Sequence, residues 1–373
     1  MTQWRSYFMF SSNLDSMILE FVQPFMDAHR DRLDRCFWER HSAGGPHLRI
    51  RFKGDPDALE SVAAALRAEA KDYFEAHPSP DLESYSPANA AAFLEKEGAV
   101  YTEDDLVYRN NVIVERAFPP NPHGFESDEA ANYMYDFHHD ATHFVGAVLS
   151  DPRPNREIVL RLYFAHAALA VGNIPGGSVT WKSHWEGFRS SISSPVLIDR
   201  IKEAYDADRE GIFAHLTEIE TICETGDWRR DPILEEWKQL IDVYSARASR
   251  EVRKGHSFTS QLQSPEQAAE ARARAAESLE RESSFVRTFW SDDRFLLSIN
   301  KDVHFQVPRL LVNLFYGMIA RVGLKPLDKM VLCHHVQRSV EEHFGVDLEK
   351  FLAANMAAVV KRQTGSSEAP AAG

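Results

Sequence analysis

The alternation of apolar and polar residues in "GGPHLRIRFKG", residues 44–54, predicts a β-strand with two unlike faces. Side chains alternate along a strand, so the apolar residues lie on one face while His47, Arg49 and Arg51 share the other. Adjacent positive charges repel one another. The polar face is therefore either solvated beside acidic neighbours or turned toward an anionic group, which arginine binds through its planar fork of donors. The pattern alone leaves both interpretations open.

The first third of the chain shows a regular succession of such patterns. An aromatic strand, an amphipathic helix, two strands joined through "SAGG", a helix that Asp55 caps and a β-rich stretch that ends in "VERAF" follow one another. This is the order of a split βαβ, ferredoxin-like unit. We therefore predict the α+β fold class, with an N-terminal split βαβ (ferredoxin-like) sheet unit over residues 1–118 and a large helical remainder.

Helical spacing of apolar residues dominates after the sheet unit and predicts a mainly helical part over residues 119–363. Within it, "NIPGGSVTWKSHWEGF" is expected to form a glycine-containing loop, and "PRLLVNLFYGMIARVG" a buried helix that begins near Pro308. No internal repeat is visible, and we expect residues 1–363 to form a single domain. The small-residue tail, residues 364–373, is expected to be disordered.

Composition and charge narrow the function classes. The chain has 373 residues, of which 44% are hydrophobic and 26% charged, as in an ordinary globular protein. No apolar run approaches the roughly 18 residues of a membrane span and no signal peptide is visible, so we expect a cytoplasmic protein without a membrane partner. The formal net charge of -14 argues against direct binding of nucleic acid. No metal is predicted, because the three cysteines lie far apart and "HHDATH" lacks a third ligand.

Four further residues are candidates for chemistry. Arg116 ends a β-rich stretch, where catalytic groups and surface ion pairs are both common. His304 precedes the expected buried helix, with Arg309 near the start of that helix, and the positive end of the helix dipole favours the neutral imidazole that a general base requires. A structural hydrogen bond is the alternative role of this histidine. His184 lies between two tryptophans, so it either packs against aromatic rings or contacts a substrate.

In order along the chain, three stretches resemble the landmarks of the C-terminal domain of lantibiotic dehydratases. They are "FWERHSAGGPHLRIRFKG", "VERAF" with the later "YMYDFHHDATHFVGAVL", and "VHFQVPRLLVNLFYG", and they span nearly the whole chain. The same domain occurs alone in the thiopeptide-type bacteriocin biosynthesis proteins. The resemblance implies that the chain takes part in the maturation of a ribosomally synthesised precursor peptide, made of a leader and a core, and that it needs no cofactor.

The reaction that the resemblance implies is a lyase reaction on glutamylated serine or threonine. A separate glutamylating protein forms the glutamyl ester, and the domain eliminates glutamate to give dehydroalanine or dehydrobutyrine. Removal of the Cα proton needs a base and a nearby cation, and guanidinium groups can bind the departing carboxylates. The positions that match the landmarks predict the catalytic residues Arg51, Arg116 and His304. The expected substrate-binding residues are His47, Arg49, His184 and Arg309.

The chain also departs from the pattern of the family. Ile113 stands in place of a glutamate, "AFP" in place of Tyr-Gly-Gly, Ala141 in place of a serine and Pro308 in place of an asparagine. An altered elimination site is expected of a thiopeptide pyridine synthase, an offshoot of the same fold that joins two dehydroalanines in a formal (4+2) cyclisation and expels water and the leader peptide. We expect glutamate elimination ahead of this cyclisation because both arginines and the histidine are retained. A non-catalytic peptide-binding subunit is the third hypothesis.

Overall fold

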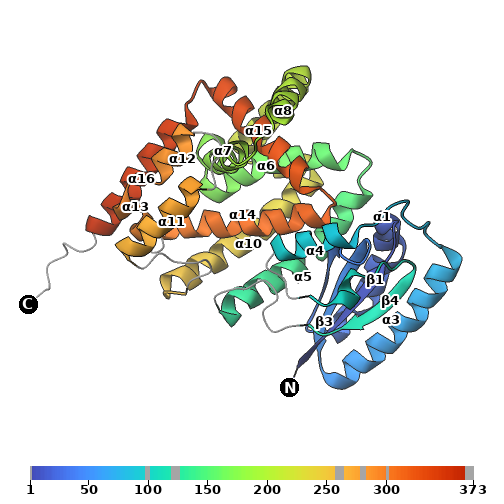
Figure 1. The fold of residues 1–373 in the computed structure, drawn as a ribbon. Coiled ribbons are helices and arrows are strands. Elements are labelled where there is room, and N and C mark those ends of the chain that lie inside the picture. Colours follow the sequence, from blue (N-terminus) through green and yellow to red (C-terminus); the bar gives the residue numbers. More distant parts are fainter. Residues whose placement is uncertain are drawn as a thin grey trace, which may run out of the picture. The chain divides into compact units, whose positions relative to one another are not determined.

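The computed structural model describes residues 2–96, 101–118, 127–256, 264–277, 283–299 and 302–365. It has the predicted α+β fold, in which a small sheet near the N-terminus is followed by helices (Figure 1). The chain divides into two compact units. Unit 1 comprises Met1–Pro152 and Gly317–Gly323, and unit 2 comprises Arg153–Tyr316 and Leu324–Gly373. The single domain over residues 1–363 stays a prediction.

Unit 1 is built on a four-stranded antiparallel sheet with the strand order β2-β3-β1-β4. The strands are β1 (Gln3–Phe10), β2 (Arg35–His41), β3 (His47–Gly54) and β4 (Val112–Arg116). The helices of this unit in the described residues are α1 (Leu14–Met17), α2 (Gln23–His29), α3 (Pro56–Ala76), α4 (Pro87–Lys96) and α5 (Asp128–Ser150). The order of strands and crossovers confirms the predicted ferredoxin-like unit. The predicted β-rich stretch that ends in "VERAF" is a strand only over β4, because Glu103–Leu106 forms a 3-10 turn.

Helix α3 runs along the sheet and covers its apolar face (Figure 1). Asp55 caps the helix, as expected, by accepting a hydrogen bond from the backbone nitrogen of Asp57 (3.0 Å). Arg67 of α3 lies 3.4 Å from the hydroxyl of Tyr7 on this face of β1. The apolar side chains of β3, such as Ile50, are buried between sheet and helices. Removal of this apolar surface from water is the main force that holds α3 against the sheet.

The basic face of β3 is buried in the structure. Arg51 is 3% exposed and His47 is 1% exposed. Aromatic rings cover this face, because the ring of Phe8 stacks on His47 at 4.8 Å and the Arg51 guanidinium lies 4.7 Å from the ring centre of Phe118. A solvated polar face is therefore the wrong interpretation of the alternating pattern.

Helix α5 packs against the edge strand β2. Nδ1 of His139 lies 3.0 Å from the backbone nitrogen and 3.0 Å from the backbone oxygen of Cys36. The fully buried Arg321 donates a hydrogen bond to the carbonyl oxygen of His138 (2.8 Å), and burial lowers the pKa of this arginine to about 9. The guanidinium therefore remains charged at neutral pH and binds α5 within unit 1.

Unit 2 is helical throughout its described residues. Its helices are α6 (Asn155–Val171), α7 (Ile174–Ser190), α8 (Pro195–Ala207), α9 (Arg209–Thr225), α10 (Pro232–Arg253), α11 (Pro265–Glu277), α12 (Ser284–Phe289), α13 (Asp293–Ser298), the first part of α14 (Val303–Arg321), α15 (Pro326–Phe344) and α16 (Leu348–Gly365). A fully buried aromatic cluster around Trp181, Trp237 and Phe315 forms its centre. Residues 366–373 of the tail that was expected to be disordered lie outside the described residues.

The stretch expected to be a loop is helix α7, so that expectation is wrong. Asn173 caps the helix by accepting a hydrogen bond from the backbone nitrogen of Gly176 (2.7 Å). A Cβ on Gly177 would lie 2.1 Å from the carbonyl oxygen of Ala167 in α6. The glycine therefore permits the close packing of α6 and α7, whereas the sequence pattern suggested that it served a turn.

Helix α14 begins at Val303, several residues before Pro308, where the pattern placed its start. Asp302 is the reason, because its carboxylate accepts hydrogen bonds from the backbone nitrogens of His304 (2.8 Å) and Phe305 (3.2 Å). The cap allows the helix to continue through Pro308, which lies inside it. His304 is consequently the second residue of the helix, whereas it was expected to precede it.

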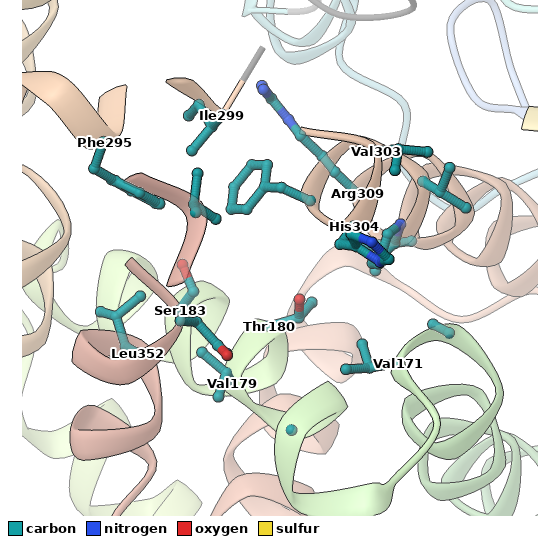
Figure 2. Close-up of a pocket in the computed structure, with 18 of the residues that line it drawn as sticks. Val171, Val179, Thr180, Ser183, Phe295, Ile299, Val303, His304, Arg309 and Leu352 are labelled. Atoms are coloured by element: carbon teal, nitrogen blue, oxygen red, sulfur yellow. The ribbon is translucent and has the colours of Figure 1, made fainter. Parts of the chain in front are cut away.

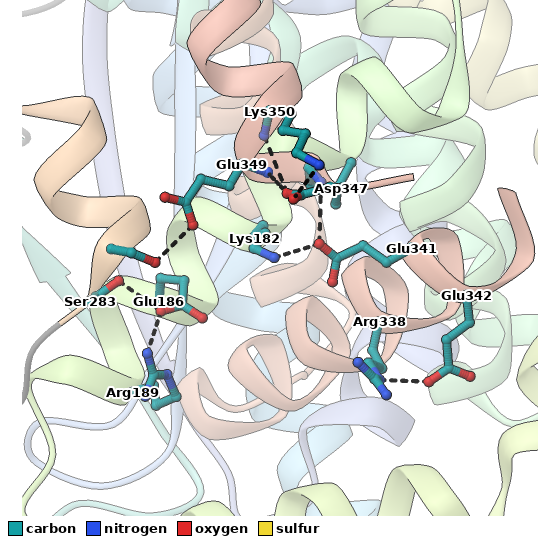
Figure 3. A network of polar contacts seen from close by, with 12 residues as sticks. Lys182, Glu186, Arg189, Ser283, Arg338, Glu341, Glu342, Asp347, Glu349 and Lys350 are labelled. Carbon is teal, nitrogen blue, oxygen red and sulfur yellow. Dashed lines mark hydrogen bonds and ion pairs between the residues drawn. The ribbon is translucent and has the colours of Figure 1, made fainter. Parts of the chain in front are cut away.

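A network of side chains connects α7, α15 and α16 (Figure 3). Lys182 of α7 donates a hydrogen bond to the carboxylate of Glu341 in α15, which also accepts one from the backbone nitrogen of Leu348 at the start of α16 (3.2 Å). Glu186 of α7 accepts a hydrogen bond from the Ser283 hydroxyl (2.8 Å). Because these groups are largely shielded from water, the network fixes α7 and α16 in one arrangement.

No single helix of the described residues is long and apolar enough to cross a membrane. Helices α6 and α7, which are bent by 115° relative to each other, are long and apolar enough only when they are counted as one segment.

Candidate functional site

A cavity of ≈ 940 Å³ opens within unit 2 among residues of α6, α7, α10, α12, α13, α14 and α16 (Figure 2). Apolar and aromatic side chains form most of its lining, among them Val179, Phe289, Phe295, Ile299 and Leu352. Ligand pockets in proteins commonly measure about 300–1,000 Å³ and combine such a lining with a few polar groups. The cavity therefore has the size and character of a binding site for a large organic ligand.

Helix α14 contributes His304 and Arg309 to the lining, and both side chains are exposed. Figure 2 shows them on the side of the hollow opposite Ser183 and Leu352. The cap by Asp302 fixes the backbone at His304, and the same carboxylate accepts a hydrogen bond from Arg362 (2.7 Å). The start of α14 is thus fixed at the wall of the cavity, and the exposed side chain of His304 can be reached by a ligand.

Helix α7 forms another wall with Thr180, Ser183 and His184. Nδ1 of His184 donates a hydrogen bond to the carbonyl oxygen of Thr180 (2.8 Å). Burial lowers the pKa of His184 to about 4; the hydrogen bond opposes this shift and the nearby Lys329 adds to it. The ring is therefore neutral at pH 7, and Nε2 carries its lone pair.

The charged side chains of the lining are basic. Arg253, Arg309 and Arg362 line the cavity, whereas no aspartate or glutamate occurs among its described lining residues. This is a local reversal of sign in a chain whose formal net charge is -14. Such a cavity favours ligands that are anionic or rich in carbonyl oxygens, such as peptides.

Arg51 and Arg116 lie on one face of the sheet in unit 1. Both pair with Ser6 of the central strand β1, Arg51 from β3 and Arg116 from β4. Arg51 donates a hydrogen bond to the Ser6 hydroxyl, and its Nη2 lies 3.9 Å from the carboxylate of Glu39. Burial lowers the pKa of Arg51 to about 10 and Glu39 opposes the shift, so the side chain remains charged at neutral pH. The protein itself thus supplies the groups that compensate this arginine.

Arg116 is engaged with acidic residues of the same unit. It donates a hydrogen bond to Asp104, and its Nε lies 3.7 Å from the carboxylate of Asp105. The hydrogen bond from Arg116 is the main cause that lowers the pKa of Asp104. Two carboxylates therefore neutralise the guanidinium that was predicted to take part in glutamate elimination.

His47 and Arg49, the other basic residues of β3, contact neighbouring rings and backbone. Nδ1 of His47 lies 2.9 Å from the carbonyl oxygen of Gly45, and burial keeps the pKa of this histidine well below its usual value. The guanidinium of Arg49 lies 5.1 Å from the ring centre of Phe8. His47 is consequently neutral at pH 7, and the face carries less positive charge than its sequence suggests.

The predicted site residues fall into two sets, one within each unit. His184, His304 and Arg309 line the cavity of unit 2. The set in unit 1 lies on the basic face of the sheet and consists of Arg51, Arg116, His47 and Arg49. The roles of all these residues stay predictions.

A family profile described as "Lantibiotic biosynthesis dehydratase C-term" matches residues 4–340. The chain belongs to this family. The predicted family is thereby confirmed, and with it a place among proteins that mature ribosomally made peptides. No curated protein sequence matches the chain.

Three solved structures resemble this member of the lantibiotic dehydratase C-terminal family. The pyridine synthase TbtD from thiomuracin biosynthesis has a TM-score of 0.73 at 21% identity, and the match covers 92% of this chain and 100% of TbtD. TsrL has a TM-score of 0.67 at 15% identity, with 95% of this chain and 98% of TsrL covered. The tRNA-dependent lantibiotic dehydratase MibB from Microbispora sp. 107891 has a TM-score of 0.46 at 12% identity, with 92% of this chain and 28% of MibB covered.

Several polar residues that line the cavity were not among the site residues predicted from the sequence. They are Thr180, Ser183, Arg253, Asn313 and Asn355. The stretch that holds the first two was interpreted as a loop, which concealed that they and His184 share one face of a helix. A search for helical spacing of polar residues in "GGSVTWKSH" is the signal that would have found this face.

Proposed function

We propose that this chain is a cyclase of ribosomal peptide maturation that joins two dehydroalanine residues of a precursor peptide in a formal (4+2) cyclisation and forms a pyridine. The amide proton of one dehydroalanine moves from nitrogen to the carbonyl oxygen, and two carbon–carbon bonds then close the ring. Loss of water and of the leader peptide, which leaves as an amide, makes the ring aromatic. The electrons balance without an oxidant or a reductant.

The observation that carries the proposal is the cavity of unit 2. Its ≈ 940 Å³ gives room for two dehydroalanines and their neighbours, which must meet inside one folded peptide. Its apolar and aromatic lining suits the vinyl groups and heterocycles of such a peptide, and its arginines can bind peptide carbonyl oxygens. His304 is the residue proposed to move protons at the reacting amide.

The hydrogen-bond and ion-pair partners of Arg51 and Arg116 also support cyclisation ahead of glutamate elimination. A leaving glutamate needs guanidinium groups whose donors are available to its carboxylates. Arg51 is instead buried against Ser6 and Glu39, and Arg116 is paired with Asp104. In this arrangement the donors of both arginines are engaged by groups of unit 1. We also note that this chain and the pyridine synthase TbtD correspond over nearly their whole lengths.

Glutamate elimination is the second candidate, favoured by one observation. Arg51 and Arg116 flank Ser6 in one row across the sheet, which is the kind of arrangement in which two guanidinium groups could share one dicarboxylate. A glutamylated precursor peptide would then be the substrate, and a separate glutamylating protein the partner.

The experiment that tests the proposal gives the purified protein two precursor peptides in parallel. One carries two dehydroalanines, and the other carries glutamylated serine. We expect the first to yield a macrocycle and a released leader amide by mass spectrometry, while the second keeps its glutamate. Release of glutamate with no macrocycle would replace the proposal by elimination. Binding of both peptides without conversion would replace it by a non-catalytic role.

A further inference from the structure

Two histidines line the cavity of unit 2, one on α14 and one on α7. They differ in their surroundings, because His304 is exposed at the start of its helix whereas His184 is largely enclosed within α7. We propose that His184 is a second catalytic residue, which takes a proton from the reacting amide through Nε2 while His304 supplies one to the carbonyl oxygen. This inference rests on the proposed cyclisation.

The first support is the fixed tautomer of His184. Its Nδ1 lies 2.8 Å from the carbonyl oxygen of Thr180, one helical turn earlier. A carbonyl oxygen only accepts, so Nδ1 carries the proton and Nε2 is the ring nitrogen that can accept one. A general base needs this arrangement, in which one ring nitrogen is held by a hydrogen bond and the other is available.

The second support is the environment of the ring, which keeps its lone pair available in the neutral form, while the same environment makes Nε2 a weaker base than free imidazole. The edge of His184 meets the ring of Tyr316 at 5.0 Å, and the ammonium group of Lys329 lies 4.2 Å from the centre of the same tyrosine ring. Lys329 and burial both disfavour a charged imidazole at this place. No carboxylate of the described residues lines the cavity and opposes them. The neutral base is therefore the resting state at neutral pH.

The third support is that the other buried histidines of unit 2, which are His166, His334 and His335, do not line the cavity. His166 is fully buried among Trp181, Trp237 and Phe315, and neither of its ring nitrogens has a hydrogen-bond partner in the described residues. It does not line the cavity. His166 packs within the aromatic core, whereas His184 has a fixed tautomer and lies on the cavity wall.

The proton balance of the reaction suits two imidazoles. In the first step His184 takes the amide proton and His304 gives one to the carbonyl oxygen, so His184 gains one proton and His304 loses one. In the loss of water, His184 returns its proton to the departing hydroxyl while His304 takes a proton from a ring carbon. In the loss of the leader, His184 takes a proton from a ring carbon and His304 gives one to the leaving nitrogen, as in the first step. Proton exchange with water then restores both rings before the next turnover.

The variant that tests this role is His184→Asn. Asparagine can still donate a hydrogen bond to the Thr180 carbonyl but has no group in the place of Nε2. We expect turnover of the dehydroalanine peptide to fall by about 10²–10⁴-fold, as for other general bases, while the peptide's Kd changes by less than about two-fold. His215→Asn, on α9 and away from the cavity, is the matched control and should keep wild-type turnover.

The outcomes separate this role from the proposed function. If the wild-type protein does not cyclise the peptide, the proposed function fails and the role fails with it. If the wild-type protein is active and the His184→Asn variant keeps its turnover, the role alone is overturned. Loss of peptide binding together with turnover, in a variant whose circular dichroism and melting temperature match wild type, would assign His184 to substrate binding and also overturn the role.

Discussion

The basic face of the sheet in unit 1 and the cavity in unit 2 both gather basic residues in an acidic chain, but Arg51 on the sheet is buried whereas His304 and Arg309 of the cavity are exposed. On the sheet, Arg51 bonds to Ser6 and lies near Glu39, and Arg116 pairs with Asp104. The described lining of the cavity contains arginines and histidines without an acidic residue. A cluster of basic residues in a sequence therefore indicates a binding site only if the fold places those residues where a ligand can reach them.

The comparison assigns stability to the sheet face and chemistry to the cavity. A buried arginine with internal partners fixes the strands that carry those partners, and its removal is expected to weaken the fold. An exposed histidine on a cavity wall contributes little to folding and can meet a substrate. The substitutions of His304, Arg51 and Arg116 described below separate the two roles.

The largest effect is expected from His304→Ala in the cavity. Loss of a proton-transfer group should reduce turnover of the dehydroalanine peptide by about 10²–10⁴-fold. The melting temperature should stay near the wild-type value, because the side chain is exposed. Liquid chromatography with mass spectrometry measures the macrocycle, and an unchanged rate would remove His304 from the site.

Arg51→Met is expected to lower the free energy of unfolding and to leave catalysis nearly unchanged. The substitution removes the hydrogen bond to Ser6 and the interaction with Glu39 from a buried position, at a cost of about 3 kcal/mol in the free energy of unfolding. Turnover per folded molecule should stay within about two-fold of wild type, since unit 2 holds the proposed reaction. Chemical denaturation and the cyclisation assay measure the two quantities. A stable variant without activity would return Arg51 to catalysis.

His166→Phe is expected to change the pH dependence of stability. Burial lowers the pKa of folded His166 from 6.5 to about 3, so the unfolded chain binds a proton first. The stability that the neutral ring provides is complete above pH 6.5 and is lost as the pH falls toward 3, with a maximal slope of about 1.4 kcal/mol per pH unit. Denaturation midpoints over this range should fall less steeply in the variant. An equal slope would show that His166 is protonated in the folded protein.

The smallest effect is expected from Arg116→Gln. The ion pair with Asp104 is partly solvated, so its loss should leave the melting temperature unchanged. Turnover of the dehydroalanine peptide should also be unchanged. A large loss of turnover, measured in the same cyclisation assay, would contradict the separation of the two regions.

Much of the sheet could be predicted from the sequence, because period-two alternation and helix caps such as Asp55 are local signals. The partners of Arg51 could not, since Ser6 and Glu39 reach it through the register of other strands. In unit 2, Gly177 indicated a turn but serves the contact with Ala167. The roles of Arg51 and Gly177 depend on contacts between elements that are distant in the chain, and these contacts cannot be read from a single sequence.

Only part of the candidate site was found from the sequence, because the rest depends on contacts that the sequence pattern does not show. His304 and Arg309 were selected from their place in the chain and line the cavity. Asp302, which starts α14 early, was missed, although an aspartate before a helix is a common cap. The tautomer of His184 depends on the helix that the sequence pattern concealed, so its chemistry could not be anticipated.

The most direct test of the account is to locate the bound peptide. A precursor peptide with a photoreactive group in place of one dehydroalanine can be crosslinked to the protein, and the labelled residues identified by mass spectrometry. The account predicts labels in Ile174–Ser190 and Val303–Arg321, the helices that carry His184 and His304. Labels confined to His47–Gly54 and Val112–Arg116 would contradict it, because they would place the reacting peptide on the sheet.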